Sequence, residues 1–291
     1  MKQQSDIKIG VIGGSGIYEM EGISRIEEIS ISTPFGNPSD KFMVGDLNGI
    51  KIAFLPRHGR GHNLLPSELN YRANIFGFKK LGVTHLISIT AVGSLQENIA
   101  PLDIVIPDQL FDRTFQRENT FFGDGLVAHI PFAEPFCPVL SDLLFQAASS
   151  ITAKVHKGGT LVTIEGPAFS TKAESRLYQK WGIDIIGMTS LQEAKLAREA
   201  EICYGAIAMV TDYDCWREKS EAVSVKVVLS YLEKNTNCAK KILHRLAPQI
   251  TKETNCDCGH SLKDAIMTRM EGINEDTRQR LFPLIEKYLT K

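Results

Sequence analysis

The sequence lacks any apolar run close to the roughly 20 residues that a membrane-spanning helix requires. Its first residues, Met1 to Lys8, are polar and contain no apolar core of the kind found in secretory signal peptides. Neither sign of charge is in excess, because 33 basic side chains face 34 acidic ones. No global field therefore draws the protein to nucleic acid or to an anionic membrane. These absences predict a cytoplasmic enzyme that acts on small molecules, with no nucleic-acid or membrane partner.

The six cysteines include no C-x-x-C pair, and their one local cluster is Cys256-Asp-Cys258. A zinc ion needs further ligands close by, and only His260 is near in the sequence. The sequence therefore predicts no metal site and favours free thiols, with a disulfide as the alternative. The same polar stretch, Thr251–His260, is the best candidate for a mobile loop.

Apolar, β-branched runs alternate with helical patterns along the whole chain, which predicts an α/β fold with a largely buried sheet. The predicted strands are Ile7–Ile12, Lys51–Leu55, His85–Thr90, Ile104–Ile106, Leu161–Ile164, Ile183–Gly187 and Ala206–Val210. The predicted helices are Tyr71–Leu81, Val139–Ser150, Lys172–Trp181, Leu191–Ile202, Val225–Leu246 and Thr277–Leu289. Thr171 with Glu174, and Ser190 with Glu193, fit capping boxes. Without a linker or repeat, residues 1–291 form one predicted domain with a C-terminal helical segment.

Gly13-Gly14-Ser15-Gly16 follows the first predicted strand directly. A glycine-rich turn at this place exposes backbone N–H groups that bind an anion. It is not a dinucleotide fingerprint, because the position that needs a third glycine holds Glu19. The motif predicts a small phosphate-binding turn that carries the Ser15 hydroxyl, and a purely structural turn is the alternative.

The segment PRHGRGH, residues 56–62, places two arginines and two histidines at the end of the next predicted strand. Arginine forms bidentate contacts with phosphate, so the loop predicts an anion site. A solvated basic loop and a His-x-x-x-His zinc site are the alternatives. Thr90 and the amides after it, at the end of the following strand, are suited to hold a phosphate oxygen or a sugar, and a purely structural turn at the strand end is the alternative.

Two further motifs lie between a strand and a helix start: EGPAFST, residues 165–171, and Gly187-Met188-Thr189. Thr189 comes directly before a predicted helix, whose N-terminus attracts an anion. Phe169 is suited to stack on a flat base, although Phe169 and Met188, each taken alone, are more often core residues.

TDYDCW, residues 211–216, ends an apolar strand in two acids. Asp212 and Asp214 point to one side if the chain stays extended. Such a pair allows one acid to protonate a leaving group while the other accepts a hydrogen bond. Helix capping, a salt bridge or metal binding are the alternatives.

Together these motifs resemble those of the 5'-methylthioadenosine phosphorylases, a branch of the trimeric purine nucleoside phosphorylase family. The shared segments, in family order from Ile7 to Leu232, are GGSGIY, PRHGRGH, EGPAFST, GMTS, EAKLAREAEICY and TDYDCW with the later EAVSV. The resemblance implies a single phosphorylase/hydrolase-like α/β domain, with a mixed twisted sheet flanked by helices. It also implies a homotrimer in which His129-Ile130-Pro131 of a neighbouring subunit closes the 5' pocket.

The resemblance also assigns the site residues. The implied phosphate ligands are Ser15, Arg57, His58, Thr90, Ala91 and Thr189. Met188 is placed against the ribose, and around the base are Phe169, Ser170, Asp212 and Asp214. The implied 5' pocket consists of His62, Pro66, Val225, Val228 and Leu229. The resemblance implies no metal and no cofactor. Inorganic phosphate is a co-substrate of the implied reaction.

The implied reaction is phosphorolysis of 5'-methylthioadenosine to adenine and 5-methylthioribose 1-phosphate, a step of purine and methionine salvage. Asp212, with a raised pKa, acts as the general acid towards N7 of the base, and Asp214 accepts from the 6-amino group. The alternative is a phosphorylase of 6-oxopurine nucleosides or methylthioinosine. The carboxylate pair disfavours it, since a carboxylate repels the O6 acceptor of those bases.

Overall fold

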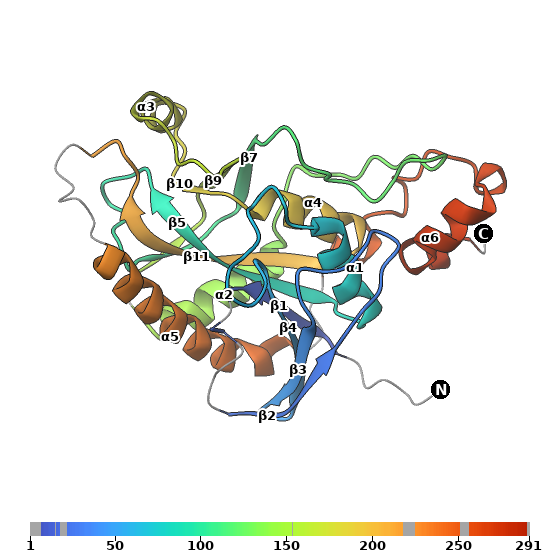
Figure 1. Ribbon diagram of the computed structural model, residues 1–291, viewed down its shortest axis with the longest axis horizontal. Coiled ribbons are helices and arrows are strands. Elements are labelled where there is room, and N and C mark those ends of the chain that lie inside the picture. Colours follow the sequence, from blue (N-terminus) through green and yellow to red (C-terminus); the bar gives the residue numbers. More distant parts are fainter. Residues whose placement is uncertain are drawn as a thin grey trace.

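The computed structural model describes residues 7–14, 16–17, 22–152, 154–217, 225–250 and 256–289. Within these ranges eleven strands form one mixed sheet that runs through the middle of the molecule (Figure 1). The strands are β1 (Ile9–Gly13), β2 (Ile23–Ile29), β3 (Phe42–Leu47), β4 (Ile50–Pro56), β5 (His85–Ser94), β6 (Ile104–Ile106), β7 (Gln109–Arg113), β8 (Val155–Lys157), β9 (Thr160–Ile164), β10 (Ile185–Gly187) and β11 (Cys203–Tyr213).

Helices cover both faces of this sheet (Figure 1). They are α1 (Tyr71–Lys80), α2 (Pro138–Ser149), α3 (Lys172–Lys180), α4 (Ser190–Glu199), α5 (Val225–Ile250) and α6 (Glu275–Ile285), with short 3-10 turns at Asp257–His260, Met270–Gly272 and Glu286–Tyr288. Buried side chains of α1 and α4 share one hydrophobic core with the sheet. Those of α2 and α5 share the core on the other face. None of the helices in the described ranges combines the length and the hydrophobicity that a membrane crossing requires.

The long strand β5 organises the sheet, because three strands pair with it. On one side β11 runs parallel to it along its whole length, from His85 to Ser94. On the other side β1 pairs in parallel only as far as Ser88, and β10 pairs antiparallel from Gly93 onward. The sheet is therefore mixed, as predicted, and it forks along β5.

The C-terminal residues 262–289 pack on the α1 and α4 face of the sheet, as Figure 1 shows in red, whereas Cys258 before them lies in the core on the α2 and α5 face. Leu262, Leu281 and Leu284 enter the core there, and each is 2% exposed or less. The expected C-terminal helical segment is present. Of the predicted mobile loop Thr251–His260, residues 251–255 lie outside the described residues, and Asp257–His260 form a short 3-10 helix in which Cys258 is buried.

Every predicted strand and helix is found within a few residues of its expected place, whereas β2, β3, β7 and β8 were not predicted. One helix start is as expected: Thr171 and Glu174 form a capping box before α3. The other capping box is wrong. The N-cap of α4 is Thr189, with no side-chain capping bond, and the Glu193 carboxylate binds Arg57 instead.

Candidate active site

Four polar motifs meet at one edge of the sheet, because β1, β4, β5 and β11 run parallel to one another. Parallel strands bring their carboxyl ends to the same edge, which is where open α/β sheets bind ligands. The backbone N–H of Arg57 after β4 donates to the carbonyl of Gly13 at the end of β1, at 2.8 Å. The two predicted phosphate motifs are therefore in direct contact.

The fork in β5 opens a gap at this edge. Between Ser88 and Gly93, no strand in the described ranges pairs with the β1 side of β5. Thr90, which is buried, and Ala91, which is exposed, lie in this interval. Backbone groups left without a ladder partner need another partner, and an anion or a sugar is suited to the N–H groups.

Arg57 is buried, and most of its donors are already used. Its Nε and Nη2 bind Glu193, Nη2 also donates to Ser88 Oγ at 2.7 Å, and Nη1 donates to the Ile89 carbonyl at 3.1 Å. Glu193 in turn accepts from Tyr204 OH at 3.0 Å. A guanidinium has five N–H groups, and Nη1 has one acceptor in the described part of the chain, so one hydrogen is left for a ligand.

His58 is a neutral ring at physiological pH. Burial lowers its pKa to about 4. Its Nδ1 lies 2.8 Å from the Leu64 carbonyl, which only accepts, so Nδ1 carries the hydrogen and Nε2 presents a lone pair. The ring of His62 stacks on it with centroids 4.4 Å apart. His62 is exposed, and Pro66 is half-buried in the same loop.

Thr189 and Met188 bring the helix start of α4 into the site. Thr189 is 5% exposed and, as the N-cap, spends no hydroxyl hydrogen bond on the helix. Its hydroxyl and the first amides of α4 can therefore receive an anion. Met188 lies against Gly166, whose φ is 68°. This positive φ favours glycine, and a Cβ there would come within 2.7 Å of the Met188 sulfur, so the flexible Met188 side chain would also have to move.

Asp212 and Asp214 lie together around Gly93, as the extended-chain argument predicts. A Cβ at Gly93 would be 3.2 Å from Asp212 Oδ1 and 3.5 Å from Asp214 Cβ. A β-bulge between Val210 and Asp212 precedes them. Burial raises the pKa of Asp212, and the charge of Asp214 raises it further, against a hydrogen bond from Thr211. Burial also raises the pKa of Asp214.

Two buried polar atoms at this acid pair, one on an acid and one on the neighbouring loop, lack a hydrogen-bond partner. Asp214 Oδ2 and Ser170 Oγ make no hydrogen bond with any described residue, although the Ser175 hydroxyl and the Cys215 N–H lie close enough to the Asp214 carboxyl to lower its pKa. The Ser170 loop reaches this place, because Cys215 Sγ donates to the Ser170 carbonyl at 3.2 Å. Unsatisfied buried polar atoms are costly, so a ligand is the expected partner. Phe169 next to them is 84% exposed, which rules out a core role in this chain.

Arg117 is a functional candidate that the sequence did not reveal. Its side chain is 1% exposed and pairs with Glu165. It also donates to the carbonyl of Met188, to Gln192 and, at 3.0 Å, to Tyr71 OH. This single arginine therefore joins the EGPAFST loop to the start of α4. No motif or period marks it in the sequence, because it lies in the irregular segment after β7.

Some predicted site residues lie beyond what the structure describes. Ser15 is outside the described residues. Val225, Val228 and Leu229 belong to the first turns of α5, but their side chains are not described. The predicted 5' pocket therefore remains a prediction for these residues.

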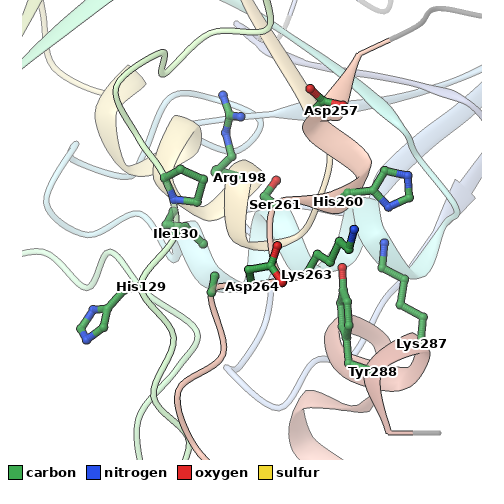
Figure 2. Close-up of a pocket in the computed structure, with 12 residues that line it drawn as sticks. His129, Ile130, Arg198, Asp257, His260, Ser261, Lys263, Asp264, Lys287 and Tyr288 are labelled. Atoms are coloured by element: carbon green, nitrogen blue, oxygen red, sulfur yellow. The ribbon is translucent and has the colours of Figure 1, made fainter. Parts of the chain in front are cut away.

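A pocket of about 910 Å³ lies elsewhere, between the 129–131 segment, Arg198 of α4 and the C-terminal segment (Figure 2). None of the candidate phosphate or base residues is part of its described lining. Its charged side chains carry both signs, as Lys263 and Asp264 show (Figure 2). The pocket includes the residues that the resemblance places at a subunit contact.

Comparison with known proteins gives a consistent result. A sequence model described as the Phosphorylase superfamily matches residues 8–248. The S-methyl-5'-thioadenosine phosphorylase of Geobacter sulfurreducens is 55% identical over 97% of this chain and 99% of its own. The protein of the same name from Nitrosopumilus maritimus is 48% identical over 90% of this chain and 99% of its own.

Solved structures show the same likeness. A methylthioadenosine phosphorylase from an Antarctic soil metagenomic library has a TM-score of 0.93 and 46% identity, covering 96% of this chain and 99% of its own. A mutant adenosine/methylthioadenosine phosphorylase of Schistosoma mansoni, in complex with methylthioadenosine, has a TM-score of 0.79 and 40% identity, covering 86% and 93%.

Proposed function

We propose that the chain cleaves 5'-methylthioadenosine with inorganic phosphate, because it belongs to the phosphorylase superfamily and, within it, to the S-methyl-5'-thioadenosine phosphorylases. The products are adenine and 5-methylthioribose 1-phosphate. The enzyme is a pentosyltransferase of purine and methionine salvage. Phosphate is a co-substrate, and the reaction requires no cofactor because the phosphate itself supplies nucleophile and counter-charge.

The observation that carries the proposal is the acid pair after β11. Asp214 presents a buried Oδ2 without a protein partner, which suits the 6-amino group of adenine. Asp212 has a raised pKa, as a general acid requires, which supports the role proposed for it as the donor of a proton to N7 as the glycosidic bond breaks. A 6-oxopurine would set its O6 acceptor against Asp214, so that buried charge would lose its donor.

The phosphate lies, in this proposal, in the gap on the β1 side of β5. Arg57 offers one N–H, Thr189 a hydroxyl, and the amides around Ala91 further donors. Arg57 is already paired with Glu193, so the positive potential comes largely from amides and the α4 N-terminus. Neutral His58 accepts the P–OH hydrogen of HPO₄²⁻ at Nε2, because Nδ1 carries the ring hydrogen.

Catalysis follows from position and charge. The C1'–N9 bond breaks ahead of attack, so the ribose becomes cationic, and the dianion held beneath C1' stabilises it. A phosphate oxygen then forms the new bond to C1' while the proton of Asp212 passes to the leaving adenine. Phe169 stacks on the base, and its exposed ring is available for this contact.

The assembly is part of the proposal. A single domain with a C-terminal helical segment forms a homotrimer, and the 129–131 segment reaches a neighbour's 5' pocket beside Val225, Val228 and Leu229. Exposed apolar side chains support such a contact: Phe115 is 74% and Met267 63% exposed. Sedimentation analysis at micromolar concentration tests the trimer. The cytoplasmic location stays a prediction.

The decisive experiment measures adenine release from 5'-methylthioadenosine with and without phosphate. Adenosine, inosine and methylthioinosine are tested beside it at equal concentration. The expected result is phosphate-dependent release that is fastest with 5'-methylthioadenosine. Preference for inosine or methylthioinosine would overturn the assignment of the acid pair, and release independent of phosphate would overturn the phosphorolytic mechanism.

A further inference from the structure

Four cysteines from three distant parts of the chain meet at the opposite end of β11 from the acid pair. They are Cys137, Cys203, Cys256 and Cys258, and their sulfur atoms all lie within 4.8 Å of one another. Three of the four residues are buried, and Cys256 is half-buried. From this geometry we infer that the cluster is a tetrahedral thiolate site for one structural zinc ion.

The spacing of the sulfur atoms fits one shared ion. A zinc ion bound by four thiolates at about 2.3 Å has neighbouring sulfur atoms about 3.8 Å apart. Two disulfides need close contact only within each pair, at about 2.05 Å. Here all four sulfur atoms are mutually close, and Cys203 and Cys256 are 3.2 Å apart. That common proximity is what a single tetrahedral centre requires.

The surroundings also favour thiolates. Cys137 is the N-cap of α2, and its sulfur accepts a hydrogen bond from the Leu140 N–H at 3.5 Å. A helix N-terminus and an N–H donor both stabilise a negatively charged sulfur. Tetrahedral sets of four sulfur ligands are typical of zinc and of iron–sulfur centres, and of these two the proposed occupant is zinc.

The ion would fasten the C-terminal segment to the sheet. Cys203 begins β11, whereas Cys256 and Cys258 begin the C-terminal segment, whose first turn is visible at Asp257 and His260 in Figure 2. Further along, Glu201 accepts from the Leu262 N–H at 3.0 Å. Zinc would therefore fix the start of a segment that the core already holds further on. The acid pair lies nine residues along β11, about 30 Å away, so zinc takes no part in the reaction.

The first test determines metal and thiols in the native full-length protein, purified without chelator or metal resin after growth with added zinc. Plasma mass spectrometry should find about one zinc ion per chain. Intact mass without reductant should correspond to all six cysteines reduced. A mass about 4 Da lower would indicate two disulfides and overturn the proposal. Reduced protein without zinc, or with iron in its place, would overturn it too.

A matched pair of variants tests the ligand set. Cys258→Ser should lower the zinc content about tenfold or more and lower Tm. Cys238→Ser is the control, because Cys238 is a half-buried thiol of α5 outside the cluster. It should keep zinc and Tm. Equal zinc in both variants would exclude the cluster as the site.

A measurement on the native chain covers the case in which Cys258→Ser does not fold. Titration with a mercurial reagent should release zinc in step with modification of the cluster thiols, as followed with a zinc-sensitive dye. Thiol modification that leaves the zinc bound would place the metal elsewhere and refute the inference.

Discussion

Glu193 is the counter-ion of Arg57, and its replacement by glutamine should make the protein depend on phosphate for stability. Glu193 is fully buried and accepts from Arg57, Ser88 and Tyr204. Glutamine keeps the size but removes the charge and turns an N–H₂ group towards the guanidinium. Removal of one partner of a buried ion pair costs about 3–5 kcal/mol. About 2 °C per kcal/mol in a chain of this size gives a loss of roughly 6–10 °C in Tm.

Phosphate should restore part of this loss. A ligand at a hundred times its Kd stabilises a protein by about 2.7 kcal/mol. In the native protein the dianion meets an already neutral Arg57–Glu193 pair. In Glu193→Gln it meets an uncompensated cation, so it should bind more tightly and raise Tm by more than it does in the native protein.

The assay is thermal unfolding in phosphate and in chloride at equal ionic strength. Glu199→Gln is the matched control, because Glu199 lies on the same helix, is 4% exposed and binds Thr120 and Phe121 instead of Arg57. The phosphate-induced rise in Tm should be largest in Glu193→Gln. An equal rise in both variants would refute the placement of phosphate beside Arg57.

Three further predictions follow from the same geometry. Asp212→Asn should lower kcat/KM for 5'-methylthioadenosine by about 10²–10⁴-fold and shift preference towards 6-oxopurines. In the native enzyme kcat/KM should fall as pH rises through the raised pKa of Asp212. An equal loss on both base types in the variant would contradict the role of Asp212 as the acid. Phe169→Ala should raise KM for the nucleoside about tenfold, since stacking on a base is worth about 1–3 kcal/mol, and leave Tm and the KM for phosphate unchanged; an unchanged nucleoside KM would remove it from the site. Burial raises the pKa of Glu199 from 4.5 to about 7, so the folded state holds this proton more tightly than the unfolded state, and the free energy of unfolding falls as pH rises between these values. In denaturant titrations at several pH values, Glu199→Gln should make this fall smaller. An unchanged dependence on pH would refute the prediction.

The fold could be predicted where buried apolar runs end in polar motifs, as in β4, β5 and β11. The strand β2 was missed because its side chains are mostly exposed and three of its seven residues are charged, so it shows no alternation of apolar and polar residues. The strand β3 did leave a signal. Asn48-Gly49, with φ of 53° and 83°, forms the tight turn of the β3–β4 hairpin, and this dipeptide is a strong hairpin indicator.

The site was predicted less completely than the fold, since sequence patterns reveal single motifs and not their partners. Glu193 matched the spacing of a capping box, and only the buried position of Arg57 shows its other role. Arg117 stands alone in an irregular segment, so no period or motif marked it. The cysteine cluster was hidden for the same reason, because Cys137 and Cys203 are far from Cys256 in the chain.

The bulge at Thr211 makes the length of β11 as important to the chemistry as its composition. Up to Val210 the strand is in register with β5, and Thr211 is the extra residue before Asp212 pairs with Gly93. Deletion of this one residue would leave Asp212 opposite Gly93 but would remove the bulge, and with it the local bend and extra twist that aim the two acids, while leaving every other residue in place. Among homologous chains, a single-residue gap here would therefore mark loss or change of activity more reliably than most substitutions.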